Sequence, residues 1–162
     1  MDGFFLFTFQ ILIIPLFQIF TLNLLRKSIV MKTFKQIVVP IIITGIWINI
    51  SETIRWIFLI EPYWIEQYQK LNITFPNEKV NLIVWMIWGF LFAITIFILS
   101  KKYSLFQTTI FSWFVAFAMM WVIIWNIGIL PTRMLWFNIP LSLLETFIGA
   151  YICKRYLNLV SN

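Results

Sequence analysis

Long apolar runs, separated by short segments that carry most of the Lys and Arg residues, are the feature of this sequence that most limits its fold. Each run has about 19 residues or more, and at about 1.5 Å per residue a helix of that length crosses a hydrocarbon core of about 30 Å. A backbone in lipid must satisfy its own hydrogen bonds, which a helix does within one segment. The sequence therefore predicts an all-α integral membrane bundle in a single domain.

The predicted bundle has about four core spans and one additional N-terminal span. Together they cover approximately residues 3–25, 37–60, 82–100, 105–130 and 135–153. Glu61-Pro62 should end the span at 37–60 and begin an outer loop over 61–81, and Pro131 should end the span at 105–130. Since Met31 opens a segment that reads like a natural protein start, residues 1–30 are either a span or an upstream extension.

The distribution of basic residues predicts the orientation of the chain. Loop 26–36, the turn at 101–104 and the tail after Cys153 carry eight Lys and Arg residues on one side, against Lys70, Lys79, Arg133 and Arg55 on the other. Loops rich in Lys and Arg stay in the cytoplasm, so the C-terminus should be cytoplasmic. With the N-terminal span the chain begins outside, and without it both ends are cytoplasmic.

Composition narrows the function classes. The chain is 62% hydrophobic and only 11% charged, with a net charge of +6, no His and one Cys. The basic residues lie at helix ends rather than on one face, so we expect no nucleic-acid partner. Zinc held by His and Cys, and His-ligated haem, are excluded, and we predict neither a metal nor a cofactor. The sequence also lacks the Gly-rich, HExxH and GxSxG motifs, so we do not expect an enzyme.

Glu145 lies near the middle of the run at 135–153, and a carboxylate at that depth should face protein or water rather than lipid. A stripe of small and polar residues surrounds it at spacings of three and four, which places them on one helix face. The stripe comprises Asn138, Ser142, Glu145, Thr146, Gly149 and Cys153. Such stripes are typical of contacts between membrane helices.

The run at 37–60 carries a matching stripe of Gly45, Asn49 and Glu52, with Arg55 within pairing reach of Glu52 at i+3. We therefore predict that these two helices pack together. The predicted intramembrane polar cluster comprises Glu145, Glu52, Arg55, Asn49 and Asn126. Two interpretations remain open: the cluster is a proton or ion relay or a ligand site, or it fixes the register of the helices.

The nine tryptophans are not spread evenly through the predicted bundle. Those that map to the outer half are Trp56, Trp64, Trp85, Trp88, Trp121, Trp125 and Trp136, whereas Trp47 and Trp113 do not. One interpretation is the aromatic belt that membrane proteins place at the lipid–water border. The other is an aromatic vestibule that binds an apolar or cationic ligand.

The segments WINISE (47–52), LNITFPNE (71–78) and PLSLLE (140–145) resemble those of small multi-span bacterial inner-membrane proteins to which no function is assigned. The likeness covers about residues 31–155 and implies a bacterial plasma membrane, but no activity. We expect a non-enzymatic structural, accessory or oligomeric component, whose partners are the bilayer and a second copy or another membrane protein. The alternative is a small proton- or solute-coupled transporter or channel component that uses the polar cluster.

Overall fold

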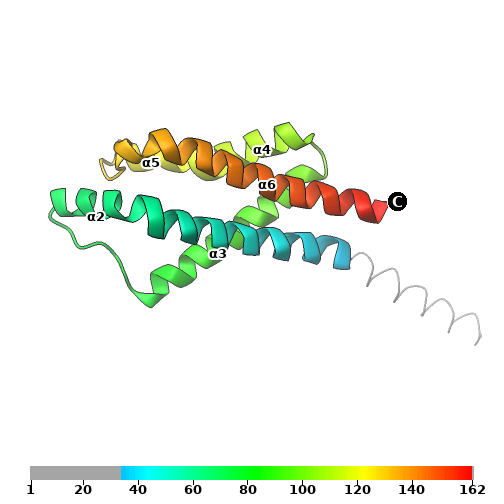
Figure 1. Cartoon of the computed structure of the whole chain (residues 1–162), viewed down its shortest axis with the longest axis horizontal. Coiled ribbons are helices and arrows are strands. Elements are labelled where there is room, and N and C mark those ends of the chain that lie inside the picture. The colour runs from blue at the N-terminus through cyan, green and yellow to red at the C-terminus, as the bar shows by residue number, and fades with distance from the viewer. Residues whose placement is uncertain (1–33, 162) are drawn as a thin grey trace, which may run out of the picture. The chain divides into compact units, whose positions relative to one another are not determined.

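The computed structural model describes residues 34–161, and this part of the chain is helical with no β-strand. Four helices in it are long and apolar enough to cross a membrane (Figure 1). They are Phe34–Lys70, Lys79–Ser100, Leu105–Asn126 and Thr132–Leu159. The predicted all-α membrane bundle is thus confirmed, whereas the predicted span at 3–25 lies outside the described residues. Every contact described below lies among residues 39–161.

The Phe34–Lys70 helix continues through the position where the sequence predicted its end. Its backbone widens into a π-helical turn, η1 (Trp56–Ile60), and goes on as α2 (Glu61–Lys70). In η1 the Glu61 N–H donates to the Trp56 carbonyl, and Pro62 then falls in the first turn of α2, where its missing N–H breaks no helical bond. The predicted break and the predicted loop over 61–81 are therefore wrong for residues 61–70.

The next two membrane-spanning helices are joined by the tight turn that the sequence predicted. Helix α3 (Lys79–Ser100) is followed by α4 (Leu105–Trp113), a π-helical turn η2 (Phe114–Ala118) and α5 (Met119–Asn126). Ser104 starts α4 with a capping box, in which its hydroxyl accepts from the Gln107 N–H and its own N–H donates to the Gln107 side chain.

The helix predicted over 105–130 ends at Asn126, four residues early, and Gly128 rather than Pro131 stops it. Gly128 has φ +79°, its N–H donates to Trp125 O, and the next N–H, of Ile129, donates to Ile124 O. This is a Schellman ending, which favours glycine at the left-handed position. A short 3₁₀ turn, η3 (Thr132–Met134), then leads into α6 (Leu135–Ser161).

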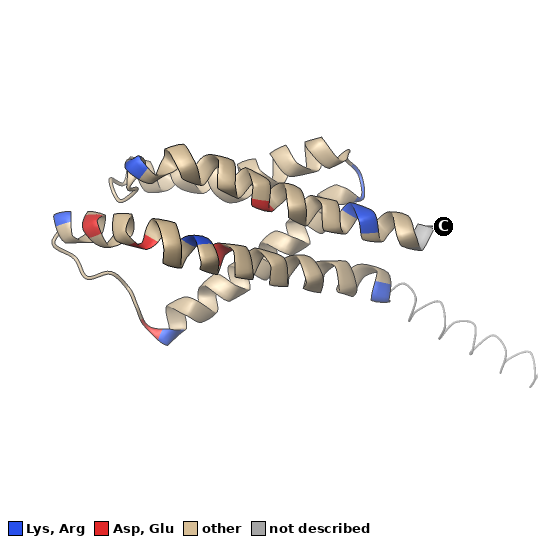
Figure 2. Ribbon diagram, viewed as in Figure 1, with Lys and Arg blue, Asp and Glu red and all other residues tan. Residues whose placement is uncertain are grey.

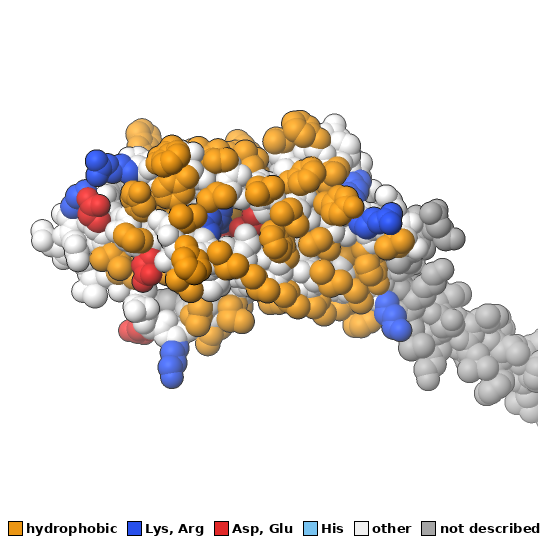
Figure 3. Space-filling view, in the orientation of Figure 1, with side chains coloured by type: hydrophobic (Ala, Val, Ile, Leu, Met, Phe, Trp, Pro, Cys, Tyr) orange, Lys and Arg blue, Asp and Glu red, His pale blue; other side chains and the backbone are white. Residues whose placement is uncertain are grey.

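Polar residues line the interior of the bundle, and large apolar residues cover its surface. Buried Thr44, Thr108, Ser112, Ser142 and Thr146 lie among core residues such as Ile48, Ile96 and Met134. Hydrophobic side chains dominate the face seen in Figure 3, and most of the large exposed ones in the described residues are Ile, Leu, Val and Phe. In lipid, contact with acyl chains has no cost for these side chains, whereas interior hydroxyls can bond to helix carbonyls. The chain is a multi-pass membrane protein.

Charged residues outside the interior lie at the two ends of the bundle (Figure 2). The turn between α3 and α4 and the last turns of α6 share one end, which carries Lys101, Lys102, Lys154 and Arg155. Gln67 of α2 donates to Gly128 O at the other end. That end carries Lys70, Lys79 and Arg133 together with Glu61, Glu66 and Glu78.

Candidate functional site

The polar stripe of α6 faces the interior of the bundle along its whole length. Each of its members is buried: Asn138, Ser142, Glu145, Thr146, Gly149 and Cys153. The spacing of three and four residues is responsible, because it keeps every member within one face of a single helix. The rest of the helix presents apolar side chains such as Leu144 and Phe147 to the surface.

The Phe34–Lys70 helix packs against this stripe, as the two matching stripes predicted. The Thr44 hydroxyl lies 3.2 Å from the Cys153 Sγ, and the Trp47 indole N–H donates to the Glu145 backbone carbonyl at 3.0 Å. One helical turn further on, the Ser51 hydroxyl donates to Glu145 Oε2 at 2.8 Å. Three successive turns of one helix are therefore tied to α6 by polar contacts.

Glu52, Arg55 and Glu145 form an ion triad at the centre of this contact. Arg55 Nη2 pairs with Glu52 Oε1 on its own helix and lies 3.3 Å from Glu145 Oε2 on α6. The side chains of Arg55 and Glu145 are only 5% and 1% exposed, whereas that of Glu52 is 18% exposed. Figure 2 shows these charges midway along the two helices, away from the charged ends. The guanidinium thus bridges two carboxyl groups in a setting that excludes most water.

Aromatic rings of the third membrane-spanning helix cover the other side of the triad. The Arg55 guanidinium carbon lies 5.3 Å from the centre of the Phe117 ring, within the range of a cation–π interaction. Phe117 belongs to the π-helical turn η2. It packs edge-on against Trp88 and Phe92 of α3, and its ring is tilted against that of Trp121. The triad is therefore enclosed by polar contacts to α6 and by an aromatic wall.

The triad holds more acidic groups and more hydrogen-bonding atoms than its own contacts satisfy. Two carboxyl groups face one guanidinium, so one carboxyl group has no cation of its own. Arg55 Nε and Nη1 and Glu145 Oε1 are buried without a hydrogen-bond partner among the described residues, as are Asn138 Oδ1 and Ser112 Oγ. Buried polar atoms in native proteins are nearly always paired, with protein or with ordered water. The site therefore has capacity for a proton and for further hydrogen bonds.

Two residues that the sequence assigned to the cluster lie elsewhere. Asn49 reaches the predicted depth, between Trp47 and Ser51, but its amide turns towards α3. It donates to Gly45 O of its own helix at 2.8 Å, and it lies so close to Gly89 of α3 that a Cβ at that position would approach its Nδ2 to 2.5 Å. Asn126 is exposed at the last position of α5. The prediction of one five-residue cluster is therefore wrong for Asn49 and Asn126.

Two contacts of the triad and one contact further along the α6 stripe were not predicted from the sequence. The first is the hydrogen bond from Ser51 to Glu145, which forms although Ser51 was not part of the predicted cluster. Trp47 lies outside the outer belt, and its interior hydrogen bond to Glu145 O explains that position. The same holds for Trp113, whose N–H donates to Ser142 Oγ at 2.8 Å. Among the described residues no group of three His, Cys, Asp or Glu could hold a metal ion.

These features define the class of protein, a multi-pass membrane bundle with an ion triad between two of its helices. Comparison with known proteins adds no relative: no protein-family model matches the chain, and neither the curated proteins nor the solved structures give a match.

Proposed function

We propose that this chain is a non-enzymatic structural, accessory or oligomeric component of a bacterial plasma membrane, in which the ion triad fixes how the helices pack. The carrying observation is the bridge from Arg55 to Glu145, which joins two helices from distant parts of the sequence. Ser51 and Trp47 add hydrogen bonds to the same residue of α6. In this proposal partner proteins or further copies bind the apolar surface, and the chain itself catalyses no reaction.

The distribution of charge supports a cytoplasmic C-terminus. One end of the bundle carries Lys101, Lys102, Lys154 and Arg155 and no acidic residue of the described chain. The other end carries as many Glu as basic residues at its border, and Arg55 is buried and does not count as a loop charge. Because the orientation of membrane proteins follows Lys and Arg in short loops, the first end should face the cytoplasm.

A reporter fused after Asn162 tests this orientation. We expect a fused green fluorescent protein to fluoresce and a fused alkaline phosphatase to be inactive, since each reporter works on only one side of the bacterial membrane. Fusions within the loop at residues 71–78 should give the reverse pattern. Active phosphatase at the C-terminus would contradict the proposed topology without affecting the fold.

A second candidate function is a proton- or solute-coupled transport component, and the unpaired atoms of the triad favour it. The surplus carboxyl group, the free Glu145 Oε1 and the two free Arg55 nitrogens offer sites for a proton and for water. Glu52 is partly exposed, so the triad is accessible from outside the bundle at this residue. Ionisable groups at bilayer depth frequently mark proton pathways. Since a bundle of this size is small for a complete pathway, such a function would require several copies or a partner.

Infrared spectroscopy of carboxyl groups separates the two functions. Purified protein in lipid is titrated between about pH 5 and 9, as wild type and as Glu145→Gln. A structural triad should show no carboxyl band that titrates in this range and disappears in the variant. The matched control is Glu66→Gln, the same substitution at an exposed residue paired with Lys70. A titrating band that Glu145→Gln alone removes would overturn the structural proposal in favour of proton coupling.

A further inference from the structure

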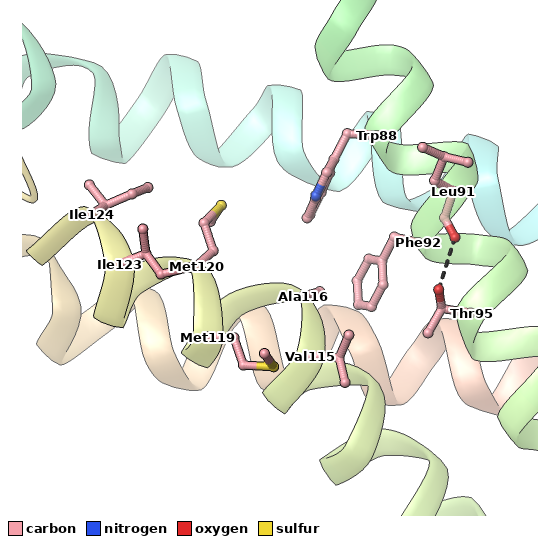
Figure 4. Close-up of a pocket in the computed structure, with 10 residues that line it drawn as sticks. All are labelled: Trp88, Leu91, Phe92, Thr95, Val115, Ala116, Met119, Met120, Ile123 and Ile124. Carbon is pink, nitrogen blue, oxygen red and sulfur yellow. Dashed lines mark hydrogen bonds between the residues drawn. The ribbon is translucent and has the colours of Figure 1, made fainter. Parts of the chain in front are cut away.

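Two cavities lie next to each other along α3, on a different side of the bundle from the ion triad's contact with α6. The first, which we call the aromatic pocket, has a volume of about 330 Å³ and is formed by α2, the loop after it, the start of α3 and the end of α5. The second, the apolar groove, has a volume of about 460 Å³ and lies between α3 and η2–α5 (Figure 4). Ile124 lines both, and the Trp85 ring of the pocket touches the Trp88 ring of the groove.

The aromatic pocket is built from rings that hold one another in place. Its rings are those of Trp56, Trp64, Tyr68, Phe75 and Trp85. Phe75 stacks on Trp56 with 5.3 Å between centres and meets Tyr68 edge-on at 5.1 Å. None of the residues that line this pocket is charged, so a headgroup that is anionic overall and has no ammonium group would find no ion pair there. Ring faces attract an ammonium group, and a preformed set of rings binds it best.

The lining of the apolar groove is almost entirely hydrocarbon, with the Trp88 indole N–H and the Thr95 hydroxyl as its polar side-chain groups. Figure 4 shows its walls, formed by Trp88, Leu91 and Phe92 of α3 and by Val115, Met119 and Met120 opposite. Thr95 also lines the groove, and its hydroxyl already donates to Leu91 O at 3.1 Å. Flexible Met side chains adapt to irregular hydrocarbon shapes. From Trp85 to Thr95 the helix descends about 15 Å into the membrane, a distance comparable to the length of an acyl chain.

We propose that the pocket and the groove form one binding site for a phospholipid with an ammonium headgroup. The ammonium group lies among the rings of the aromatic pocket at the border of the membrane, and one acyl chain lies in the apolar groove. A free amine would use only the pocket, and an anionic lipid only the groove. The pocket and the groove share Ile124, and Trp85 of the pocket contacts Trp88 of the groove. The two cavities are therefore adjacent, and one lipid molecule can occupy both. The groove shares Trp88 and Phe92 with the aromatic wall of the ion triad, but the site uses neither the charges of the triad nor the proposed function.

Native mass spectrometry tests the proposal on the full chain in detergent. The protein is incubated with equal amounts of phosphatidylethanolamine and phosphatidylglycerol that have the same acyl chains. We expect the ethanolamine lipid to be retained at least about threefold more than the glycerol lipid. Phe75→Ala should abolish this preference, while Trp136→Leu, an exposed tryptophan that lines neither cavity, should keep it. Ala116→Trp should fill the groove and lower the retention of both lipids.

Three results would overturn the site. The first is equal retention of both lipids by the wild-type protein, which requires no variant to fold. The second is a preference that survives in Phe75→Ala. The third is complete displacement of the lipid by water-soluble phosphoethanolamine, which would assign the pocket to a free amine rather than to a lipid. Circular dichroism of each variant establishes that the helices have formed.

Discussion

Replacing Arg55 with leucine should lower the free energy of unfolding by about 3–5 kcal/mol, the cost of removing one partner of a buried ion pair. In Arg55→Leu the carboxyl groups of Glu52 and Glu145 lose their shared cation while remaining away from water. Like charges at that depth repel each other strongly. The loss should shrink as the pH falls, since protonated carboxyl groups no longer repel. Reversible unfolding in mixed detergent micelles measures the effect.

Two further variants show whether charge is the cause. Lys70→Leu removes the exposed partner of Glu66 and should change stability little, because water screens this pair. Adding Glu52→Gln and Glu145→Gln to Arg55→Leu makes the triad neutral and should restore most of the lost stability, because hydrogen-bonded neutral groups replace unpaired charges. A triple variant as unstable as Arg55→Leu would show that Arg55 acts through packing against Phe117 instead.

Gly149→Leu should be the second strongly destabilising substitution, with a loss of about 1–3 kcal/mol or more. Gly149 lies on the buried stripe of α6, where the Phe34–Lys70 helix and α3 approach it from two sides. A Cβ at this position would come within 3.2 Å of both Thr44 Cγ2 and Ile96 Cδ1, so a longer side chain must push the three helices apart. Unfolding under the same conditions measures the loss.

The matched control is Leu144→Phe, which enlarges an exposed, lipid-facing residue five positions away on the same helix. It should leave stability nearly unchanged, since the added atoms meet lipid. Gly149→Ala should have an effect between the two, because the neighbours need to yield by only a few tenths of an ångström. Equal effects of Gly149→Leu and Leu144→Phe would contradict the close approach of the three helices.

The spans could be predicted from the sequence because long apolar runs have few structures open to them in lipid. The positions where the helices end could not be predicted, since a proline ends a helix in one local geometry and is tolerated in another. Pro62 normally ends a helix, but the π-helical turn before it leaves its missing N–H harmless. Pro131 was predicted to end α5, but the left-handed backbone of Gly128 ends it earlier. A π-helical turn has no clear sequence signal, so the continuation of the helix through Pro62 is seen only in the structure.

The pairing of Glu52, Arg55 and Glu145 could be predicted because charges at bilayer depth need partners, and the chain has few of them. Asn49 and Asn126 are uncharged and do not need a charged partner. Asn49 satisfies its amide through the Gly45 carbonyl one turn away on its own helix, and Asn126 lies at an exposed helix end. The contact between Arg55 and Phe117 could not be predicted, because nothing in the sequence distinguishes Phe117 from the other phenylalanines among the eighteen.

The bridge between distant helices also has a consequence for how the chain enters the membrane. Ser51 and Glu145 are 94 residues apart, so at about 5–20 residues per second the ribosome completes α6 several seconds after the helix that awaits it. During that interval Arg55 has only Glu52, one turn away, as a charged partner. The local pair keeps the early helix close to neutral until Glu145 arrives. Because Glu52 already neutralises Arg55, the early helix can stay in lipid until α6 is made, and Glu145 then completes the triad.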